Sequence, residues 1–324
     1  MLSLVTGGAG FVGSHLVNAL VDDGEEVIVI DNLSTGQIRN LEHGVSSGRV
    51  TFVFADVVEP PERLREIVEG AARGKRLNRI YHLASPASPE AYGQHPWETL
   101  AVNGFATMSL IEVSLQYGAR FLFVSTSEIY GDPLVHPQPE GYFGNVDPIG
   151  PRSCYDEGKR FGEAAVAAAV RARSLDGRIV RFFNCYGPSM EGEDGRLIPS
   201  LLSAISAGGR LPIHGSGKQT RSMTFIDDAI ELLRLVMDRP QPKLQPINIG
   251  NDDERSVEEI AKTLAVIAGV RYDPEILPAR EGDPQRRKPD LSLARTYGWA
   301  PSTSLEEGLR LTYRWYQEDR REFA

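Results

Sequence analysis

Leu2-Ser3-Leu4-Val5-Thr6-Gly7-Gly8-Ala9-Gly10-Phe11-Val12-Gly13 is the stretch that decides the fold of this chain. Its apolar start predicts a buried strand, and a segment with helical periodicity follows the glycines. Glycine permits the backbone angles of a tight turn and lets main-chain N–H groups reach a pyrophosphate at the positive end of a helix. A strand, turn and helix of this kind indicate a dinucleotide site, whose candidates are Gly7, Gly10, Phe11, Val12 and Gly13.

Strands and helices alternate along the first half of the chain. Short apolar runs predict the strands, and longer segments with helical periodicity separate them. Right-handed crossovers would place helices on both faces of a parallel sheet, so we expect an α/β protein of the Rossmann, doubly wound type. The predicted strands are Leu2–Val5, Glu26–Ile30, Val50–Ala55, Arg79–Leu83, Arg120–Val124 and Ile179–Phe183, and the predicted helices are Phe11–Val21, Pro61–Arg73, Asn103–Tyr117 and Tyr155–Arg173.

The second predicted strand ends in Asp31-Asn32, at the distance expected for an acid that holds a ribose diol. Such a carboxylate disfavours the extra phosphate of NADP, so the sequence predicts NAD, although capping of a turn is an alternative role for Asp31. Ligands bind outside the carboxyl ends of parallel strands, which places Asp56 near the adenine. The further cofactor candidates are Asp31, Asn32, Ser34, Thr35, Gly36, Asp56, Val57, Leu83, Ala84, Ser85 and Asn103.

Glycine and proline punctuate the chain after Asn184, where the regular alternation ends. Later strand-like and helical pieces occur at Pro246–Ile249 and Val257–Ile267. We predict a smaller C-terminal, substrate-binding lobe that packs against the sheet domain. Residues 1–184 would form the NAD-binding domain, with 225–250 returning to it, and residues 185–224 and 251–324 would form the lobe.

Charge and composition exclude several classes of function. The net charge of -9 argues against a nucleic-acid partner, because a basic stripe is typical of such surfaces. Cys154 and Cys185 are the only cysteines and lack the spacing of a disulfide framework or a zinc site, so we expect no metal. No run of about 18 apolar residues occurs, and we expect a cytoplasmic protein with no membrane partner.

Tyr155 and Lys159 lie four positions apart, on one face of a predicted helix. An ammonium beside the phenol would favour the phenolate below its ordinary pKa of about 10 and make Tyr155 a base for an alcohol. An exposed helix pair is the alternative that so short a motif leaves open. We predict that both residues are catalytic and also contact the cofactor.

These motifs resemble the extended short-chain dehydrogenase/reductase superfamily, also described as NAD-dependent epimerases and dehydratases. The resemblance spans nearly the whole chain. Within the superfamily, the sequence most resembles the UDP-glucuronate decarboxylases, or UDP-xylose synthases. The stretches that carry this likeness are Leu83–Pro89, Thr126–Pro133, Gly150–Arg160, Gly215–Arg221 and Arg286–Asp290.

Thr126-Ser127-Glu128 distinguishes the decarboxylases from their relatives. The 4,6-dehydratases usually have an aspartic acid in place of Ser127, and the 4-epimerases typically lack the acid in place of Glu128. The resemblance implies a lyase in which NAD oxidises C4 of UDP-glucuronate while Tyr155 takes the hydroxyl proton and Thr126 bonds the same oxygen. The resulting β-keto acid would lose carbon dioxide, and return of the hydride would give UDP-xylose.

The resemblance also implies roles for charged residues in a nucleotide-sugar site. Glu128 and Arg287 would lie near the sugar carboxylate, with Arg287 and Ser127 as candidate proton donors. Repulsion between Glu128 and that carboxylate would raise one of their pKa values, and we hypothesise that it promotes decarboxylation. Arg221 and Arg287 would bind the diphosphate and the carboxylate, with exposed ion pairs as the alternative. The substrate-binding candidates are Pro86, Tyr92, Asn184, Arg196, Leu197, Arg221 and Arg287.

Two other functions stay open. A 4-epimerase of a nucleotide sugar would need the same NAD and the same catalytic triplet of Thr126, Tyr155 and Lys159, and carbon dioxide release separates it from a decarboxylase. A redox-inactive NAD-binding regulator would need no Tyr–Lys pair. One departure concerns the substrate, because Ser189 stands where the decarboxylases usually have an arginine and the acidic segment Glu191–Asp194 follows.

The resemblance finally implies a homodimer. The subunits would meet through the predicted helices Asn103–Tyr117 and Tyr155–Arg173. The apolar stretch Ala164–Val170 is compatible with such a contact.

Overall fold

A seven-stranded parallel sheet forms the centre of the computed structural model, which describes residues 1–190, 195–241, 243–280 and 282–322. The strand order is β11-β6-β5-β4-β1-β2-β3. This order reverses direction at β1, so the carboxyl ends of β1 and β4 lie side by side and open a crevice between their loops. The strands are β1 (Leu2–Thr6), β2 (Glu26–Asp31), β3 (Val50–Phe54), β4 (Arg79–His82), β5 (Arg120–Thr126), β6 (Gly177–Phe182) and β11 (Ile247–Ile249).

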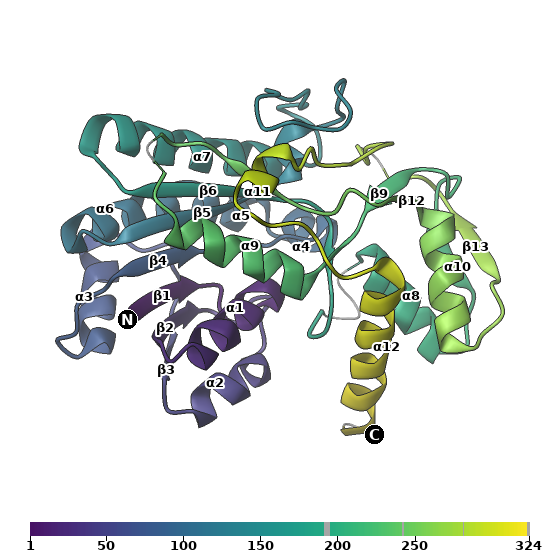
Figure 1. Cartoon of the computed structure of the whole chain (residues 1–324), viewed down its shortest axis with the longest axis horizontal. Coiled ribbons are helices and arrows are strands. Elements are labelled where there is room, and N and C mark those ends of the chain that lie inside the picture. Colours follow the sequence, from purple (N-terminus) through teal and green to yellow (C-terminus); the bar gives the residue numbers. More distant parts are fainter. Residues whose placement is uncertain (191–194, 242, 281, 323–324) are drawn as a thin grey trace.

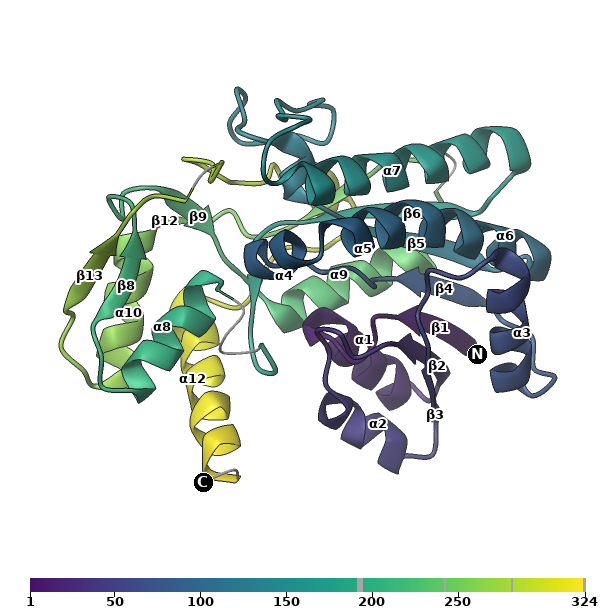
Figure 2. The same ribbon diagram turned by 180° about the vertical axis from the view of Figure 1, so that it is seen from behind.

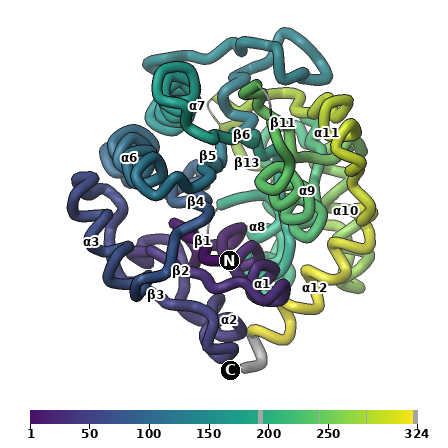
Figure 3. Tube along the Cα trace, turned by 60° about the vertical axis from the view of Figure 1, so that its left-hand side comes forward, coloured from purple at the N-terminus to yellow at the C-terminus, as the bar shows by residue number. Residues whose placement is uncertain are grey.

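Helices cover both faces of the sheet, as Figure 3 shows from one end of it. One layer holds α1 (Phe11–Asp22), α2 (Glu42–Ser46) and α9 (Ile226–Asp238), and the opposite layer holds α3 (Pro61–Ala72), α6 (Thr107–Tyr117) and α7 (Ser153–Arg173). Each layer buries its own apolar cluster against the sheet, because the central strands β1, β2, β4, β5 and β6 have apolar side chains on both faces. The doubly wound fold is therefore confirmed.

The predicted strands and helices of the sheet domain agree closely with the observed ones. The helix expected over Asn103–Tyr117 differs, because a π-helical segment η2 (Val102–Ala106) precedes α6. Short elements surround the crevice between β1 and β4. These are η1 (Ile38–Leu41), α4 (Pro89–Gln94), α5 (Pro96–Ala101) and η3 (Ser127–Tyr130).

A smaller lobe lies beside the carboxyl ends of the strands, at the right of Figure 1 and the left of Figure 2. Three two-stranded sheets pair β7 with β10, β9 with β12 and β8 with β13. The strands of this region are β7 (Cys185–Tyr186), β8 (Leu211–His214), β9 (Thr220–Ser222), β10 (Thr224–Phe225), β12 (Glu254–Ser256) and β13 (Pro274–Leu277). The helices are α8 (Leu197–Ser206), α10 (Val257–Ala268) and α12 (Leu305–Glu322), whereas the short helix α11 (Ser292–Thr296) lies on the sheet domain beside β11.

The chain crosses between the sheet domain and the lobe more than once. After β7 and α8 it returns to the sheet through α9 and β11, and β11 pairs with β6. The C-terminal helix α12 comes back to the sheet domain, where Asp319 and Arg39 of η1 form an ion pair at 3.1 Å. The division of the chain at residues 184, 225 and 250 into two domains stays a prediction.

Within the described ranges, no helix combines the length and the apolar character needed to cross a membrane.

Candidate active site

The turn after β1 cannot accept a side chain at two of its glycines. Gly7 has a φ of 71°, and a Cβ there would lie 2.7 Å from the Cα of Ala84. A Cβ on Gly13 would collide with the carbonyl oxygen of Gly7. The close approach arises because β1 and β4 are neighbours in the sheet, with Thr6 opposite His82. The turn therefore brings the backbone of β1 close to that of β4 at the start of α1, where the first N–H groups of a helix have no partner within the helix and can bind a dinucleotide.

Asp31 orders the same turn through both carboxylate oxygens. Oδ2 accepts from the Ala9 amide at 2.9 Å, and Oδ1 accepts from the Leu33 amide at 2.8 Å. Burial raises the pKa of Asp31, and these two bonds oppose that rise. Asp31 thus does cap turns, but each carboxylate oxygen has a further lone pair that can accept from a ribose hydroxyl. Asn32 Nδ2 donates to Oδ2 of Asp56 at 2.9 Å and so links the loop after β2 to the loop after β3.

A cavity of about 770 Å³ lies above this turn. Most of the predicted cofactor residues line it, together with the predicted substrate residues Pro86 and Arg196. Asn103, Tyr155 and Lys159 are not among its lining residues. The lining candidates are Gly7, Gly10, Phe11, Val12, Gly13, Asp31, Asn32, Ser34, Thr35, Gly36, Asp56, Val57, Leu83, Ala84 and Ser85.

Asn103 connects the cavity wall to the π-helical segment. Its Nδ2 donates to Ser85 Oγ and to Thr99 O, both at 2.9 Å. Its Oδ1 is buried and has no hydrogen-bond partner. A buried acceptor of this kind normally has a partner, so a ligand group that donates a hydrogen bond would fit beside Ser85. The closed glycine turn, the cavity and this open acceptor together fit a bound dinucleotide.

Tyr155 and Lys159 come from the first turns of α7 and are both buried. Lys159 Nζ donates to Val124 O at 2.8 Å and lies 5.8 Å from the centroid of the Tyr155 ring. Burial lowers the pKa of Lys159 to about 7. Burial also raises the pKa of Tyr155 above its ordinary value, although a hydrogen bond with Thr126 opposes the rise.

The prediction that Lys159 makes Tyr155 ionise more readily is therefore wrong for the protein itself. Desolvation penalises the charged forms of both residues and is the largest influence on each pKa. Two nearby carboxylates, Glu128 and Asp156, raise the Tyr155 pKa further. The phenol is held neutral beside Thr126, in a form that can donate a hydrogen bond.

Tyr92 packs directly on Tyr155. The two rings are stacked, with their centroids 5.1 Å apart and an interplanar angle of 11°. Cys154 Sγ donates to Tyr92 O at 3.6 Å and joins α4 to α7 at the same point. The predicted substrate residue Tyr92 therefore packs against the ring of the predicted catalytic residue Tyr155.

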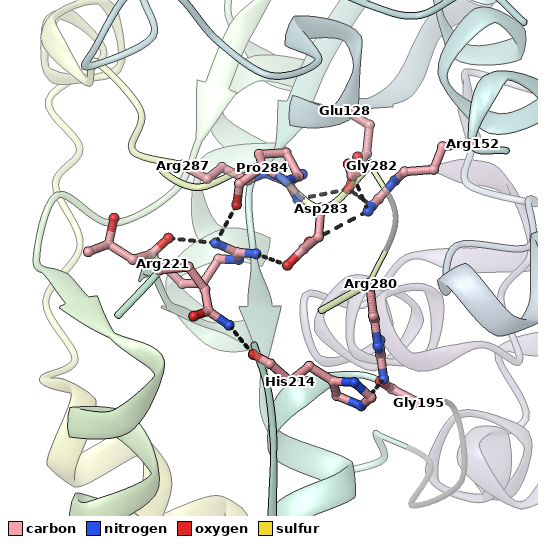
Figure 4. Close-up of polar contacts among 12 residues, drawn as sticks. Glu128, Arg152, Gly195, His214, Arg221, Arg280, Gly282, Asp283, Pro284 and Arg287 are labelled. Carbon is pink, nitrogen blue, oxygen red and sulfur yellow. Dashed lines mark hydrogen bonds and ion pairs between the residues drawn. The ribbon is translucent and has the colours of Figure 1, made fainter. Parts of the chain in front are cut away.

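Glu128 lies at the end of β5, between two arginines (Figure 4). Arg287 Nη1 donates to its Oε1 at 2.7 Å, and Arg152 Nη2 donates to the same oxygen at 2.8 Å. Burial opposes ionisation of Glu128, but Arg287 and Arg152 outweigh it and lower the Glu128 pKa. Asp156, buried close by, has its pKa raised to about 7 by burial and by Glu128. One carboxylate of this pair is therefore held ionised and the other is partly protonated near neutral pH.

Arg221 and Arg152 share a second carboxylate, that of Asp283 (Figure 4). Arg221 Nη2 lies 2.6 Å from Asp283 Oδ2, and Arg152 Nη1 lies 3.5 Å from Oδ1. Arg221 also donates to the carbonyl oxygens of Thr220 and Pro284 at 2.8 Å and 3.0 Å. The predicted alternative of an exposed ion pair does not apply to Arg221 and Arg287, because both side chains are buried.

The other predicted substrate residues are Arg196, Leu197 and Asn184. Arg196 precedes α8, which begins at Leu197, and the Arg196 guanidinium lies 5.9 Å from the centroid of the Phe11 ring. Asn184 follows β6, and its buried Oδ1 has no hydrogen-bond partner. Ser189 lines the cofactor cavity and has a φ of 62°. The acidic segment Glu191–Asp194 lies outside the described residues.

A buried glutamine fixes the segment that carries Arg287. Gln138 Oε1 accepts from the backbone amide of Lys288 at 2.9 Å, and the backbone amide of Gln138 donates to Lys288 O at 2.8 Å. The Gln138 carbonyl accepts from the Asp290 amide at 2.9 Å and from Asn248 Nδ2 at 3.0 Å. Asn248 in turn accepts at Oδ1 from Tyr130 Oη at 2.8 Å. The position of Arg287 is therefore tied on one side to β11 and on the other to the segment that carries Glu128.

Three charged residues of the site were not predicted. Arg152 and Asp156 belong to the Gly150–Arg160 motif, and their spacing from Tyr155 places them on the same first turn of α7. The spacing of Arg152 and Asp156 from Tyr155 could therefore have identified both as site residues. Asp283 had none, because it approaches Arg221 and Arg152 only through the fold of the lobe.

The described part of the chain has no group of three or more His, Cys, Asp and Glu side chains that could hold a metal ion.

The sheet order, the closed glycine turn and the Tyr155–Lys159 pair define a dinucleotide-dependent protein of the Rossmann class. The model of the NAD dependent epimerase/dehydratase family matches residues 3–250. UDP-glucuronic acid decarboxylase 1 of Xenopus tropicalis is 41% identical over 317 residues, which cover 98% of this chain and 72% of that protein. The chain belongs to the NAD dependent epimerase/dehydratase family, and its cofactor is NAD.

Solved structures agree with this assignment. UDP-glucose 4-epimerase of Thermotoga maritima, solved with UDP-glucose, has a TM-score of 0.89 and is 30% identical, and the match covers 99% of this chain and 100% of that one. The dTDP-glucose 4,6-dehydratase DesIV of Streptomyces venezuelae, solved with NAD, has a TM-score of 0.88 and is 29% identical, with coverage of 99% and 98%. The whole chain, including the smaller lobe, therefore has the architecture of this family.

Proposed function

We propose that this protein is an NAD-dependent lyase that decarboxylates UDP-glucuronate to UDP-xylose through a 4-keto intermediate. The observation that carries the proposal is Glu128, held ionised between Arg152 and Arg287 at the end of β5. The same strand end supplies Thr126, which bonds the phenol of Tyr155. An alcohol-oxidising pair and a charged site for an acid group thus lie side by side. The likeness to UDP-glucuronic acid decarboxylase 1 supports this substrate.

Oxidation at C4 requires a group that takes the hydroxyl proton. Tyr155 accepts the hydroxyl proton as its own phenol proton passes toward the neutral form of Lys159, whose pKa of about 7 allows it to accept a proton near neutral pH. Thr126 donates to or accepts from the same sugar oxygen and fixes the alcohol beside the phenol. Bound NAD supplies a hydride acceptor at C4 and later returns the hydride to the sugar.

Loss of carbon dioxide places negative charge on the 4-keto oxygen. A neutral phenol is the right donor for that oxygen, and the raised pKa of Tyr155 keeps it neutral. Glu128 is held ionised and disfavours tight polar binding of the sugar carboxylate, which is a form of ground-state destabilisation. Ser127 and Arg287 stay the candidates for proton delivery to C5. Ser127 is buried next to Glu128, and Arg287 contacts Glu128 directly.

The proposal is tested by supplying the purified protein with UDP-glucuronate and following carbon dioxide and nucleotide-sugar products by mass spectrometry. Release of carbon dioxide with formation of UDP-xylose is the expected result. Formation of a C4 epimer that keeps its carboxyl group would replace the proposal by a 4-epimerase. Binding of NAD without turnover of any nucleotide sugar would instead support the regulator.

We extend the proposal to a cytoplasmic homodimer. An apolar surface patch runs along α5, η2, α6 and α7 and consists of Trp97, Leu100, Phe105, Met108 and Phe161. Trp97 is 80% exposed and Phe105 is 67% exposed, which is unusual unless a second subunit covers them. Both cysteines are free, which suits a reducing compartment. Light scattering should give a dimer for the protein and a monomer for Phe105→Asp, while the control Phe143→Asp, in an exposed loop, stays dimeric.

A further inference from the structure

We infer that Arg152 is a further substrate-binding and specificity residue, which binds the carboxylate of an acidic sugar together with Arg287. Arg152 caps the start of α7, one turn before Tyr155, and its carbonyl accepts from the Tyr155 amide at 3.0 Å. Its side chain is only 13% exposed and lies between Glu128 and Asp283 (Figure 4). This inference rests on the proposed function and names one more residue of the same site.

Each of the two arginines has one buried donor without a hydrogen-bond partner. Arg152 uses Nη2 for Glu128, while the neighbouring donor Nε is buried and has no partner. Arg287 uses Nη1 for Glu128, while the neighbouring donor Nη2 is buried and has no partner. Each guanidinium therefore presents an edge with one donor bonded and the next donor open. A carboxylate has two oxygens, so an incoming acid group could accept one hydrogen bond from Arg152 Nε and one from Arg287 Nη2.

The charges of the site favour an anion. Three buried guanidinium groups, those of Arg152, Arg221 and Arg287, contact two carboxylates, those of Glu128 and Asp283. The buried Asp156 is a third carboxyl group near these arginines, but its pKa is raised to about 7, so near neutral pH it balances the third positive charge only in part. A buried charge without a full counter-ion is costly. The carboxylate of an acidic sugar would supply this counter-ion. A neutral sugar with a hydroxymethyl group at the same place would leave the charge uncompensated.

Arg152 also joins the two halves of the substrate site. Asp283, which it contacts at 3.5 Å, is the partner of Arg221, the candidate ligand for the diphosphate. The contacts run without a break from Arg287 through Glu128, Arg152 and Asp283 to Arg221. Arg152 is therefore placed to discriminate between acidic and neutral sugars while the nucleotide is held elsewhere.

The test compares ligands rather than turnover. All proteins carry Tyr155→Phe, which prevents turnover, and are loaded with NAD. Calorimetry measures the dissociation constants of UDP-glucuronate and of UDP-glucose for the protein that keeps Arg152 and for its Arg152→Lys and Arg152→Met variants. Arg152→Met should weaken the binding of UDP-glucuronate by about tenfold to a hundredfold, which is the usual loss for a buried hydrogen bond to a charged group. The same substitution should change the binding of UDP-glucose by less than about threefold. Arg152→Lys keeps the charge but not the planar edge and should recover only part of the loss.

Arg171→Met, which removes an exposed arginine of the same helix, is the matched control and should change neither constant. Equal losses for the two ligands in Arg152→Met would assign Arg152 a structural role only and overturn the inference. Unchanged binding of both ligands would do the same. The outcome is distinct from that of the proposed function, because binding of the acidic sugar is measured without decarboxylation.

Discussion

Arg287 donates to the Glu128 carboxylate at 2.7 Å, although 159 residues separate the two in the sequence. Glu128 follows a strand of the central sheet, whereas Arg287 precedes α11 near the end of the chain. The contact closes the site between the sheet and the smaller lobe. The position of the Glu128 carboxylate is therefore sensitive to anything that moves the Arg287 segment.

Glu128→Gln should lower the rate of carbon dioxide release by about a hundredfold or more, because the substitution removes the charge that acts on the sugar carboxylate. Glutamine keeps the shape of the side chain, so NAD affinity measured by fluorescence titration should stay within about twofold of the original. A variant with full turnover would remove Glu128 from the mechanism.

Gln138→Ala should loosen the Arg287 segment from a distance. The substitution leaves the buried amide of Lys288 without its 2.9 Å acceptor and should cost about 1–3 kcal/mol in the free energy of unfolding. We also expect a KM for UDP-glucuronate several-fold higher, with NAD affinity unchanged. Urea unfolding and steady-state kinetics measure the two effects, and a stability loss without any change in KM would separate Gln138 from the site.

Gly7→Ala should abolish NAD binding. The new methyl group would lie 2.7 Å from the Ala84 backbone, at a φ of 71° that disfavours any side chain. Gly48→Ala is the control, because Gly48 has the same φ but a Cβ added there would have nothing within 4 Å. The control should lose about 1 kcal/mol of stability from backbone strain and still bind NAD. Equal loss of NAD binding in both variants would contradict a specific role for the turn.

Asp156 should make the protein less stable as the pH rises. Its pKa rises from an ordinary 3.8 to about 7 in the folded protein, so between these values the folded state binds more protons than the unfolded state. By linkage, the free energy of unfolding then falls with increasing pH through this window. The charged groups acting on Asp156 are Glu128, Arg152, Arg287 and Glu157.

Urea unfolding at about pH 5 and about pH 8 measures this effect, with Asp156→Asn as the comparison. The amide cannot ionise, so the variant should lose most of the decline seen between the two pH values. An identical decline in both proteins would assign it to other groups.

The sequence predicted the sheet domain because each of its strands is a local apolar run. The glycine turn, Asp31 and the strand ends could be predicted in the same way, since they follow one another along the chain. The π-helical segment η2 was not predicted, because over only five residues the apolar pattern of a π-helix cannot be told from that of an α-helix. Helices α8, α9 and α12 were also missed, since this part of the chain alternates between the sheet and the lobe.

The electrostatics of the site were less predictable than its residues. The sequence places Tyr155 and Lys159 on one helix face, but the direction of the Tyr155 pKa depends on burial, which only the packed structure gives. Likewise, Glu128 and Arg287 were both candidates, yet the pairing of Glu128 with a second arginine, Arg152, needs the three-dimensional fold. Asp283 stayed unpredicted for the same reason.

The most direct test of the account is the turnover of UDP-glucuronate by the NAD-loaded protein in deuterium oxide, with the products analysed by mass spectrometry. Carbon dioxide should be released in step with UDP-xylose that carries solvent deuterium at C5, and reduced cofactor should not accumulate. A product that keeps its carboxyl group, or a substrate recovered unchanged while NAD is bound, would contradict it.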